Sequence, residues 1–197
     1  MKIITSSVEL RDRRKAITQI LKPLALDYKK LSVYPSSTPE QYIIPVRDSN
    51  NKYSDKNYTN FRFKTTVPSV HAMYYEKWIK NYQDKKSKKE FFYLERAYLH
   101  FYIIEPSLGE EKEFLLLHCD PNEPDNAAHA KYKQSLHLHI ECSEASWPHC
   151  DVWPHAHIAL NSGYLNHVLA DVNSLTQAIK DAVLMLKEEV LDQFPQK

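Results

Sequence analysis

The chain has 197 residues, 43% of them hydrophobic and 26% charged, with 26 Lys and Arg against 25 Asp and Glu. This composition predicts one soluble globular domain, and the net charge of +1 excludes a polyanion binder driven by strong positive charge. Only 2 glycines accompany 10 histidines. So few glycines exclude a P-loop and a dinucleotide-binding fingerprint, and the histidines become the main indication of function.

The N-terminal segment MKIITSSVELRDRRK turns charged almost at once, so we expect no signal peptide. No run approaches the ~18 consecutive apolar residues of a membrane-spanning helix. The three cysteines, Cys119, Cys142 and Cys150, are odd in number and form no CxxC pair. We interpret them as free, buried thiols, and these features together predict a cytoplasmic protein without membrane association.

Residues 1–90 predict a helical and loop-rich N-terminal part of the single domain. Ser6 and Glu9 form a capping-box pattern, and apolar residues then recur at helical spacing until Pro23 ends the run. A first helix is therefore expected here, and residues 24–31 are expected to add a second helical piece.

Four segments complete this N-terminal part. Residues 35–60 are rich in Pro, Ser, Asn, Asp and Lys, which predicts a long loop. Residues 61–67 alternate and predict a short strand. A third helix is expected over 68–82, because Met, Tyr, Trp and Ile recur along it. The lysine-rich run 85–89 is interpreted as a solvated loop.

Residues 91–197 predict a His-rich antiparallel sheet and a C-terminal helix. Strands are expected at 97–105, 113–120, 135–143 and 152–161. Ser174 and Gln177 form a second capping-box pattern, before a strongly amphipathic stripe. The predicted fold class is α+β: a mainly antiparallel sheet of four to five strands, with one face packed on the C-terminal helix and the N-terminal helices alongside.

Side chains alternate along a strand, and this parity separates an apolar face from a polar face in all four predicted strands. The apolar face matches the stripe of the C-terminal helix. The polar face collects six of the ten histidines, which are His100, His118, His137, His139, His155 and His157. A one-residue slip would bury these imidazoles in the core, which the apolar pattern opposes.

Simple hairpins, with connections at 106–112 and 144–150, predict how these histidines pair across the strands. The expected pairs are His137 with His157, His139 with His155, and His100 with His118. The first two pairs would form a compact rectangle of imidazoles. A two-residue shift would keep the faces and slide the partners.

Such a cluster predicts one of two kinds of chemistry. It can bind a divalent metal such as Zn or Mn, because neutral imidazole is a common ligand for these ions and an HxH pattern on a strand aims both rings to one side. It can also act as a metal-free acid and base pair, which suits cleavage of RNA through its 2′-hydroxyl. The expected metal ligands are His137, His139, His155, His157, His118 and Asp120. The expected catalytic residues are His137, His139, His155, His157 and Glu141.

Aromatic and basic side chains near the cluster predict a phosphate-bearing substrate. Tyr98 and Tyr102 share its face and are expected to bind phosphate or stack a base, with Lys131, Lys133 and Trp153 as further substrate contacts. The leading hypothesis is a small hydrolase or nuclease that cleaves phosphodiesters in RNA, DNA or a nucleotide. The alternative is a non-catalytic partner or adaptor subunit, whose Tyr/Trp/His face is a protein interface.

The HLH sequence at 137–139 and the HAH sequence at 155–157 resemble the His-hydrophobic-His signature of HUH endonucleases. That resemblance implies a divalent metal on an antiparallel sheet and a nucleophilic tyrosine on a later helix. The predicted C-terminal helix contains no tyrosine, and the motif occurs twice, so no residue role is carried over. The PHAH sequence at 154–157 is also similar to elements of some bacterial toxins, which implies a toxin or antiviral defence role.

Overall fold

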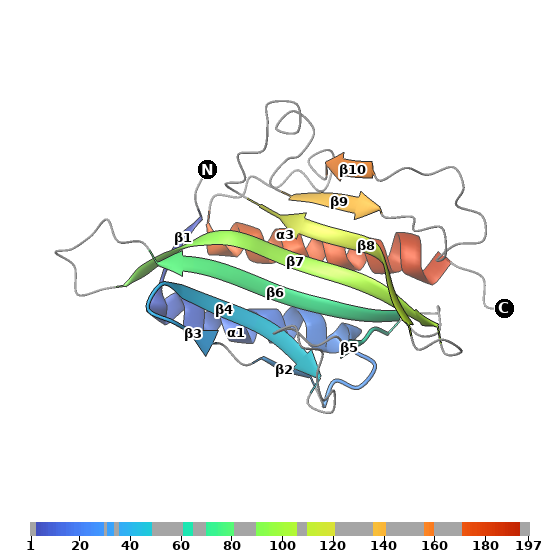
Figure 1. The fold of residues 1–197 in the computed structure, drawn as a ribbon, viewed down its shortest axis with the longest axis horizontal. Helices are drawn as coiled ribbons and strands as arrows, with labels where there is room; N and C mark the ends of the chain where they lie inside the picture. The colour runs from blue at the N-terminus through green and yellow to red at the C-terminus, as the bar shows by residue number, and fades with distance from the viewer. Residues whose placement is uncertain are drawn as a thin grey trace.

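A computed structural model describes residues 3–29, 31–33, 36–48, 61–64, 70–80, 90–105, 110–120, 136–140, 156–159 and 171–193. The described strands form one sheet in which every pairing is antiparallel. Helices α1 (Ser7–Leu21) and α3 (Val172–Met185) both lie on one side of this sheet (Figure 1). The predicted α+β fold class is therefore confirmed.

The sheet follows the strand order β10-β9-β8-β7-β6-β4-β2. In that order the strands are Ala156–Ala159, Leu136–Ile140, Glu110–Cys119, Phe91–Glu105, Val70–Lys80, Gln41–Asp48 and Leu31–Val33. Three short strands lie beside this path, namely β1 (Ile4–Ser6) on β7, β3 (Ser36–Ser37) on β4 and β5 (Phe61–Arg62) on β6. Strands from both halves of the chain thus share one sheet, which is wider than the four or five strands expected.

Helix α1 begins at the predicted capping box. The Ser6 side chain accepts a hydrogen bond from the Glu9 backbone, and the Glu9 carboxylate accepts one from the Ser6 backbone at 2.8 Å. Hydrogen bonds donated to the Glu9 carboxylate, first by the Ser6 backbone and then by the Ser6 and Thr5 hydroxyls, lower the pKa of Glu9. The helix ends before a 3-10 turn, η1 (Lys22–Leu24), in which Pro23 lies. The helical piece expected over 24–31 is wrong, because η1 is followed by a turn and then by β2.

Helix α3 carries the predicted apolar stripe but begins earlier than expected. Its N-cap is Asp171, whose side chain accepts from the Ser174 backbone at 2.8 Å, while the Ser174 hydroxyl accepts from the Asp171 backbone at 2.9 Å. The stripe residues Leu175, Ile179, Ala182, Val183 and Leu186 are all buried. The helix continues as a π turn, η3 (Leu186–Val190), and a 3-10 turn, η4 (Leu191–Gln193).

The third helix expected over 68–82 is wrong, because Val70–Lys80 forms strand β6. Burial alternates along β6, and the even-numbered residues from Val70 to Trp78 face the two helices. Glu76 lies on that buried face and interrupts the apolar alternation, which is why the period of two was missed. Arg13 of α1 compensates its charge, donating to the Glu76 carboxylate at 2.6 Å.

The loop expected over 35–60 is also wrong in part, because this segment contains β3 and β4. Strand β4 pairs with β6 from Gln41 opposite Ile79 to Pro45 opposite Tyr75. Pro45 has no backbone N–H and normally argues against a strand interior, so its presence disguised β4. The apolar residues Ile44 and Val46 are fully buried.

The core lies between the sheet and the two helices. It is one continuous cluster that includes Leu10 and Ile17 of α1, Ile179 and Val183 of α3, and Leu117 of β8. The apolar parity predicted for the central strands is correct for Leu99, Phe101, Leu115, Leu117, Cys119 and Leu138, whereas Phe114 joins the core against that parity. Within those residues, no helix is long and apolar enough to span a membrane.

Candidate metal centre on the histidine-rich face

The sheet face opposite the helices carries a continuous row of rings across four strands. Tyr75 of β6, Tyr98 of β7, His118 of β8 and His137 of β9 are direct cross-strand partners in that order. The Tyr98 and His118 rings stack with centroids 3.7 Å apart and planes 9° apart. His118 meets His137 edge-on, with centroids 5.7 Å apart. The backbone register thus holds each imidazole in a defined orientation.

Three ligand-type side chains converge at the end of this row. His118 and Asp120 stand two residues apart at the end of β8, and His137 projects from the neighbouring strand. One ligand atom from each of the three lies within 4.8 Å of the others. Their exposed fractions are only 8% for His118, 9% for Asp120 and 0% for His137. Two imidazoles and one carboxylate in this arrangement are a donor set for Zn²⁺ or a related divalent ion.

Strand β8 is buried on both faces at this point, and its two faces carry different chemistry. Leu117 and Cys119 face the helix-side core, while His118 and Asp120 face the opposite way. Burial, followed by the nearby charges of Asp120 and Glu76, raises the pKa of the Cys119 thiol well above its usual range. Because its side chain faces the core, Cys119 is not one of the three grouped donors although it stands between two of them in sequence.

A second chain of polar contacts leads away from His118. His118 Nε2 lies 3.1 Å from His100 Nε2, and His100 Nδ1 lies 2.6 Å from Glu113 Oε1. The Tyr102 hydroxyl lies 3.4 Å from His100 Nδ1. Strict alternation from Leu115 would put Glu113 on the apolar face, so the predicted site did not include it.

A β-bulge in β8 explains why Glu113 was missed. Phe101 pairs with Leu115, but the next residue of β7, Tyr102, pairs with Glu113, so that Phe114 is an extra residue. Phe114 and Leu115 both join the core, and parity is reversed from there toward Glu113. No signal in the sequence marks this reversal, although the adjacent aromatic and leucine residues are compatible with it.

Two cations stand on the same face, on the Tyr98 side of the donors. Lys77 and Arg96 are cross-strand partners, and both pair with the Glu95 carboxylate, at 2.8 Å and 3.2 Å. The Arg96 guanidinium lies over the Tyr98 ring, 5.6 Å from its centroid, and its side chain is 39% exposed. Burial alone would lower the pKa of Arg96, but Tyr98 first, then Glu95, Tyr75 and Asp120, raise it overall.

The expected rectangle of four histidines is wrong in register. In β9 and β10, His139 is the partner of His157, and His137 is the partner of Ala159. The pairing is shifted by two residues relative to the expected register. A two-residue shift of the opposite sense occurs in the hairpin of β7 and β8, where Tyr98 rather than His100 lies opposite His118. Such a shift keeps the faces and changes the partners.

The remaining predicted site residues are placed as follows. Tyr98 is buried, with 9% of its surface exposed, and Tyr102 is half-buried. His139 and His157 lie in described strands, but only their backbone pairing is described. His155, Glu141, Lys131, Lys133 and Trp153 lie outside the described residues, as do Cys142 and Cys150. The roles predicted for these residues stay predictions.

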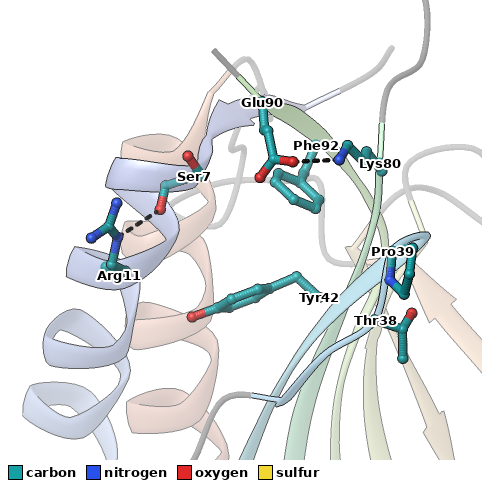
Figure 2. Close-up of a pocket in the computed structure, with 8 residues that line it drawn as sticks. All are labelled: Ser7, Arg11, Thr38, Pro39, Tyr42, Lys80, Glu90 and Phe92. Carbon is teal, nitrogen blue, oxygen red and sulfur yellow. Dashed lines mark hydrogen bonds and ion pairs between the residues drawn. The ribbon is translucent and has the colours of Figure 1, made fainter. Parts of the chain in front are cut away.

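A separate cavity of about 550 Å³ lies between the start of α1 and the sheet, away from the histidines (Figure 2). Tyr42 and Phe92 meet edge-on in its wall, with ring centroids 6.1 Å apart. Its charged groups are already engaged: Lys80 pairs with Glu90, and Arg11 Nε donates to the Ser7 carbonyl at 3.4 Å.

The fold and the site together define an α+β protein with a three-donor candidate metal centre on the open side of an antiparallel sheet. Comparisons with models of protein families, with curated proteins and with solved structures find no match. The function is consequently argued from the side chains themselves.

Proposed function

We propose that this protein is a divalent-metal-dependent hydrolase that cleaves phosphodiesters in RNA, DNA or a nucleotide. The observation that carries the proposal is the convergence of His118, Asp120 and His137, with ligand atoms within 4.8 Å and no more than 9% exposure of any of the three. All three side chains are ligand types for divalent ions, and their grouping brings one ligand atom of each close to the others. A single divalent cation could be ligated by all three at once, since each offers it a lone pair.

The choice of a hydrolytic reaction follows from the donor set. Three protein ligands leave coordination positions open for water and substrate, whereas a purely structural zinc site has four protein ligands. A divalent metal there supplies Lewis-acid chemistry, lowering the pKa of water toward about 7 and neutralising phosphate charge. Water would attack phosphorus, the bond to the leaving oxygen would break, and that oxygen would take up a proton.

The choice of a phosphate-bearing substrate follows from the neighbouring cations. Arg96 is partly exposed beside the donors, and its partner Lys77 stands next to it on β6. The two cations share one carboxylate, that of Glu95, and the Arg96 side chain keeps enough exposed surface to contact an anionic substrate. A guanidinium is well suited to this role, because it binds phosphate oxygens in a bidentate manner.

Metal binding is the first test, performed on the full chain by zinc and manganese titration and by elemental analysis. We expect one ion per chain in the wild type, and a loss of affinity of at least tenfold in His137→Ala and Asp120→Asn. His71→Ala is the matched control, because His71 lies on the same strand-rich scaffold but outside the three-donor group. An absence of bound metal in the wild type after supplementation would overturn the proposal.

Cleavage is the second test, with labelled RNA, labelled DNA and a cyclic dinucleotide, each with and without chelator. We expect chelator-sensitive cleavage of at least one of these by the wild type and none by His137→Ala. Arg96→Ala should raise KM while leaving metal affinity unchanged. Metal binding without cleavage of any of the three substrates would reject the hydrolase and leave a metal-binding protein.

A further inference from the structure

Glu113, His100 and His118 form a hydrogen-bonded chain whose direction follows from the donors and acceptors that each group offers. A carboxylate only accepts hydrogen bonds, so at 2.6 Å the proton between Glu113 and His100 belongs to His100 Nδ1. A neutral His100 then presents a lone pair at Nε2. The contact of 3.1 Å between the two Nε2 atoms therefore requires that His118 Nε2 carry the proton.

This direction leaves one nitrogen of His118 for a metal. With its proton at Nε2, the imidazole has its lone pair at Nδ1. The opposite direction, with a doubly protonated His100 donating to His118 Nε2, would put the proton of a neutral His118 on Nδ1 and leave no lone pair for an ion. Only the first arrangement is compatible with ligation by His118.

We propose that Glu113 and His100 are positioning residues that hold His118 in the Nε2–H form, so that its Nδ1 binds the metal. This inference rests on the proposed metal site and adds to it a relay of carboxylate, imidazole and imidazole behind one ligand. His100 lies outside the three-donor group, so it acts through His118 rather than on the ion. A carboxylate that orients a metal-ligating histidine typically changes metal affinity by 10–100-fold when it is removed.

Packing around the relay makes such control possible. The stacked Tyr98 ring, 3.7 Å away, restrains the ring plane of His118, and the contact with His100 orients its Nε2 edge toward β7. Tyr102 adds a contact to the same His100 nitrogen that meets Glu113. The bulge at Phe114 is the feature that turns Glu113 toward this chain.

The test combines zinc affinity with a direct measurement of where the imidazole protons reside. Long-range ¹H–¹⁵N correlation spectra of the metal-free wild type should show His118 in the Nε2–H form and His100 in the Nδ1–H form. Glu113→Ala should abolish this preference at His118 and weaken zinc binding by 10–100-fold. Glu113→Gln, whose carbonyl still accepts a hydrogen bond, should restore the tautomer and most of the affinity.

Glu90→Ala is the matched control, since Glu90 also forms a salt bridge on the sheet but lies at the separate cavity. Zinc affinity in Glu113→Ala equal to that of the wild type would overturn the relay and leave the metal site standing. An Nδ1–H form of His118 in the metal-free wild type would also overturn it. A wild type that binds no metal would reject the proposed function, while the spectra would still decide on the relay.

Discussion

Each face of the sheet buries a carboxylate, and the side chains that surround the two carboxylates differ in kind. Glu76, on the helix side, accepts hydrogen bonds from Arg13, from the Tyr74 hydroxyl at 2.5 Å and from the Trp78 indole at 2.9 Å. Asp120, on the other side, converges with two imidazoles. The first network contains its own cation, whereas the second is the donor set of the proposed metal site. The surroundings of a buried carboxylate thus decide which kind of cation can compensate its charge.

The Arg13–Glu76 pair compensates its own charges and also bonds to neighbouring residues. Burial alone would lower the pKa of Arg13, but the charge of Glu76 outweighs it and raises the pKa. Burial and the charge of Glu76 together raise the pKa of Tyr74, which keeps that phenol a neutral donor. Arg13 also donates to the Val172 carbonyl at 3.5 Å and contacts Thr176. The network joins α1, β6 and α3.

The largest expected effect on stability comes from removing Arg13 from this hydrogen-bonded network. Arg13→Met leaves Glu76 charged and uncompensated in the core, and we expect a loss of about 3–5 kcal/mol in the free energy of unfolding. Urea denaturation measures it. The matched control is Asp12→Asn, which breaks a surface pair with Lys15 whose side chains are 78% and 68% exposed. That control should lose less than about 1 kcal/mol, and equal losses in the two variants would contradict the comparison.

A pair of neighbouring leucines tests whether the two faces are energetically separate. Leu117 packs in the helix-side core and Leu116 on the histidine-rich face, with 2% and 4% of their surfaces exposed. Truncation of either to alanine should destabilise the protein by about 2–5 kcal/mol, because both leave a cavity. Only Leu116→Ala should also weaken zinc binding. A similar loss of zinc affinity in Leu117→Ala would show that the faces are coupled.

The next largest expected effect is the stabilisation of the folded protein by added zinc. Zinc at a hundred times its dissociation constant should stabilise the wild type by about 2.7 kcal/mol, since it binds the folded state. Asp120→Asn should gain almost nothing, because it lacks the carboxylate ligand. Arg13→Met, although unstable, should keep the full gain. Thermal unfolding with and without zinc distinguishes these cases, and a wild-type gain in Asp120→Asn would remove Asp120 from the site.

The smallest effect concerns a carboxylate that is neither buried nor at the site. Hydrogen bonds from the Ser174 backbone and side chain, in that order of effect, lower the pKa of the Asp171 cap. A lowered pKa in the folded state means that the cap stabilises above the unfolded pKa, and that this is lost as the pH falls through the folded value. Asp171→Asn should thus be slightly less stable than the wild type at pH 7, and the difference should shrink toward pH 3. A difference that grows on acidification would contradict this assignment.

Parts of the fold governed by local chemistry were predictable from the sequence. The capping box at Ser6 and Glu9 and the stripe of α3 follow from short-range patterns, and both are present. Strand β6 was not predictable in the same way, because Glu76 on its buried face makes sense only with Arg13, sixty-three residues away in the chain. Pairing between distant residues decides such a segment, and the local pattern does not contain it.

The candidate site was predictable in its residue types and less so in its geometry. Parity placed His118, Asp120 and His137 on one face, and the structure brings these three together. Register depends on loop lengths and bulges, which shifted both hairpins by two residues and broke the expected histidine pairs. Glu113 was lost for the same reason, since one extra residue reverses the parity of everything beyond it.

The bulge in β8 also determines how this strand can change in length. Phe114 and Leu115 are consecutive, yet both are buried in the core. Deletion of Phe114 would restore an uninterrupted ladder and keep Glu113 on the same side as His118, with the loss of one aromatic ring from the core. Deletion of Leu116 would instead turn Glu113 to the opposite side from His118. Deletion of one residue therefore has different structural consequences at different positions of β8. At the bulge, one residue can be removed without exchanging the side chains between the two faces of the sheet.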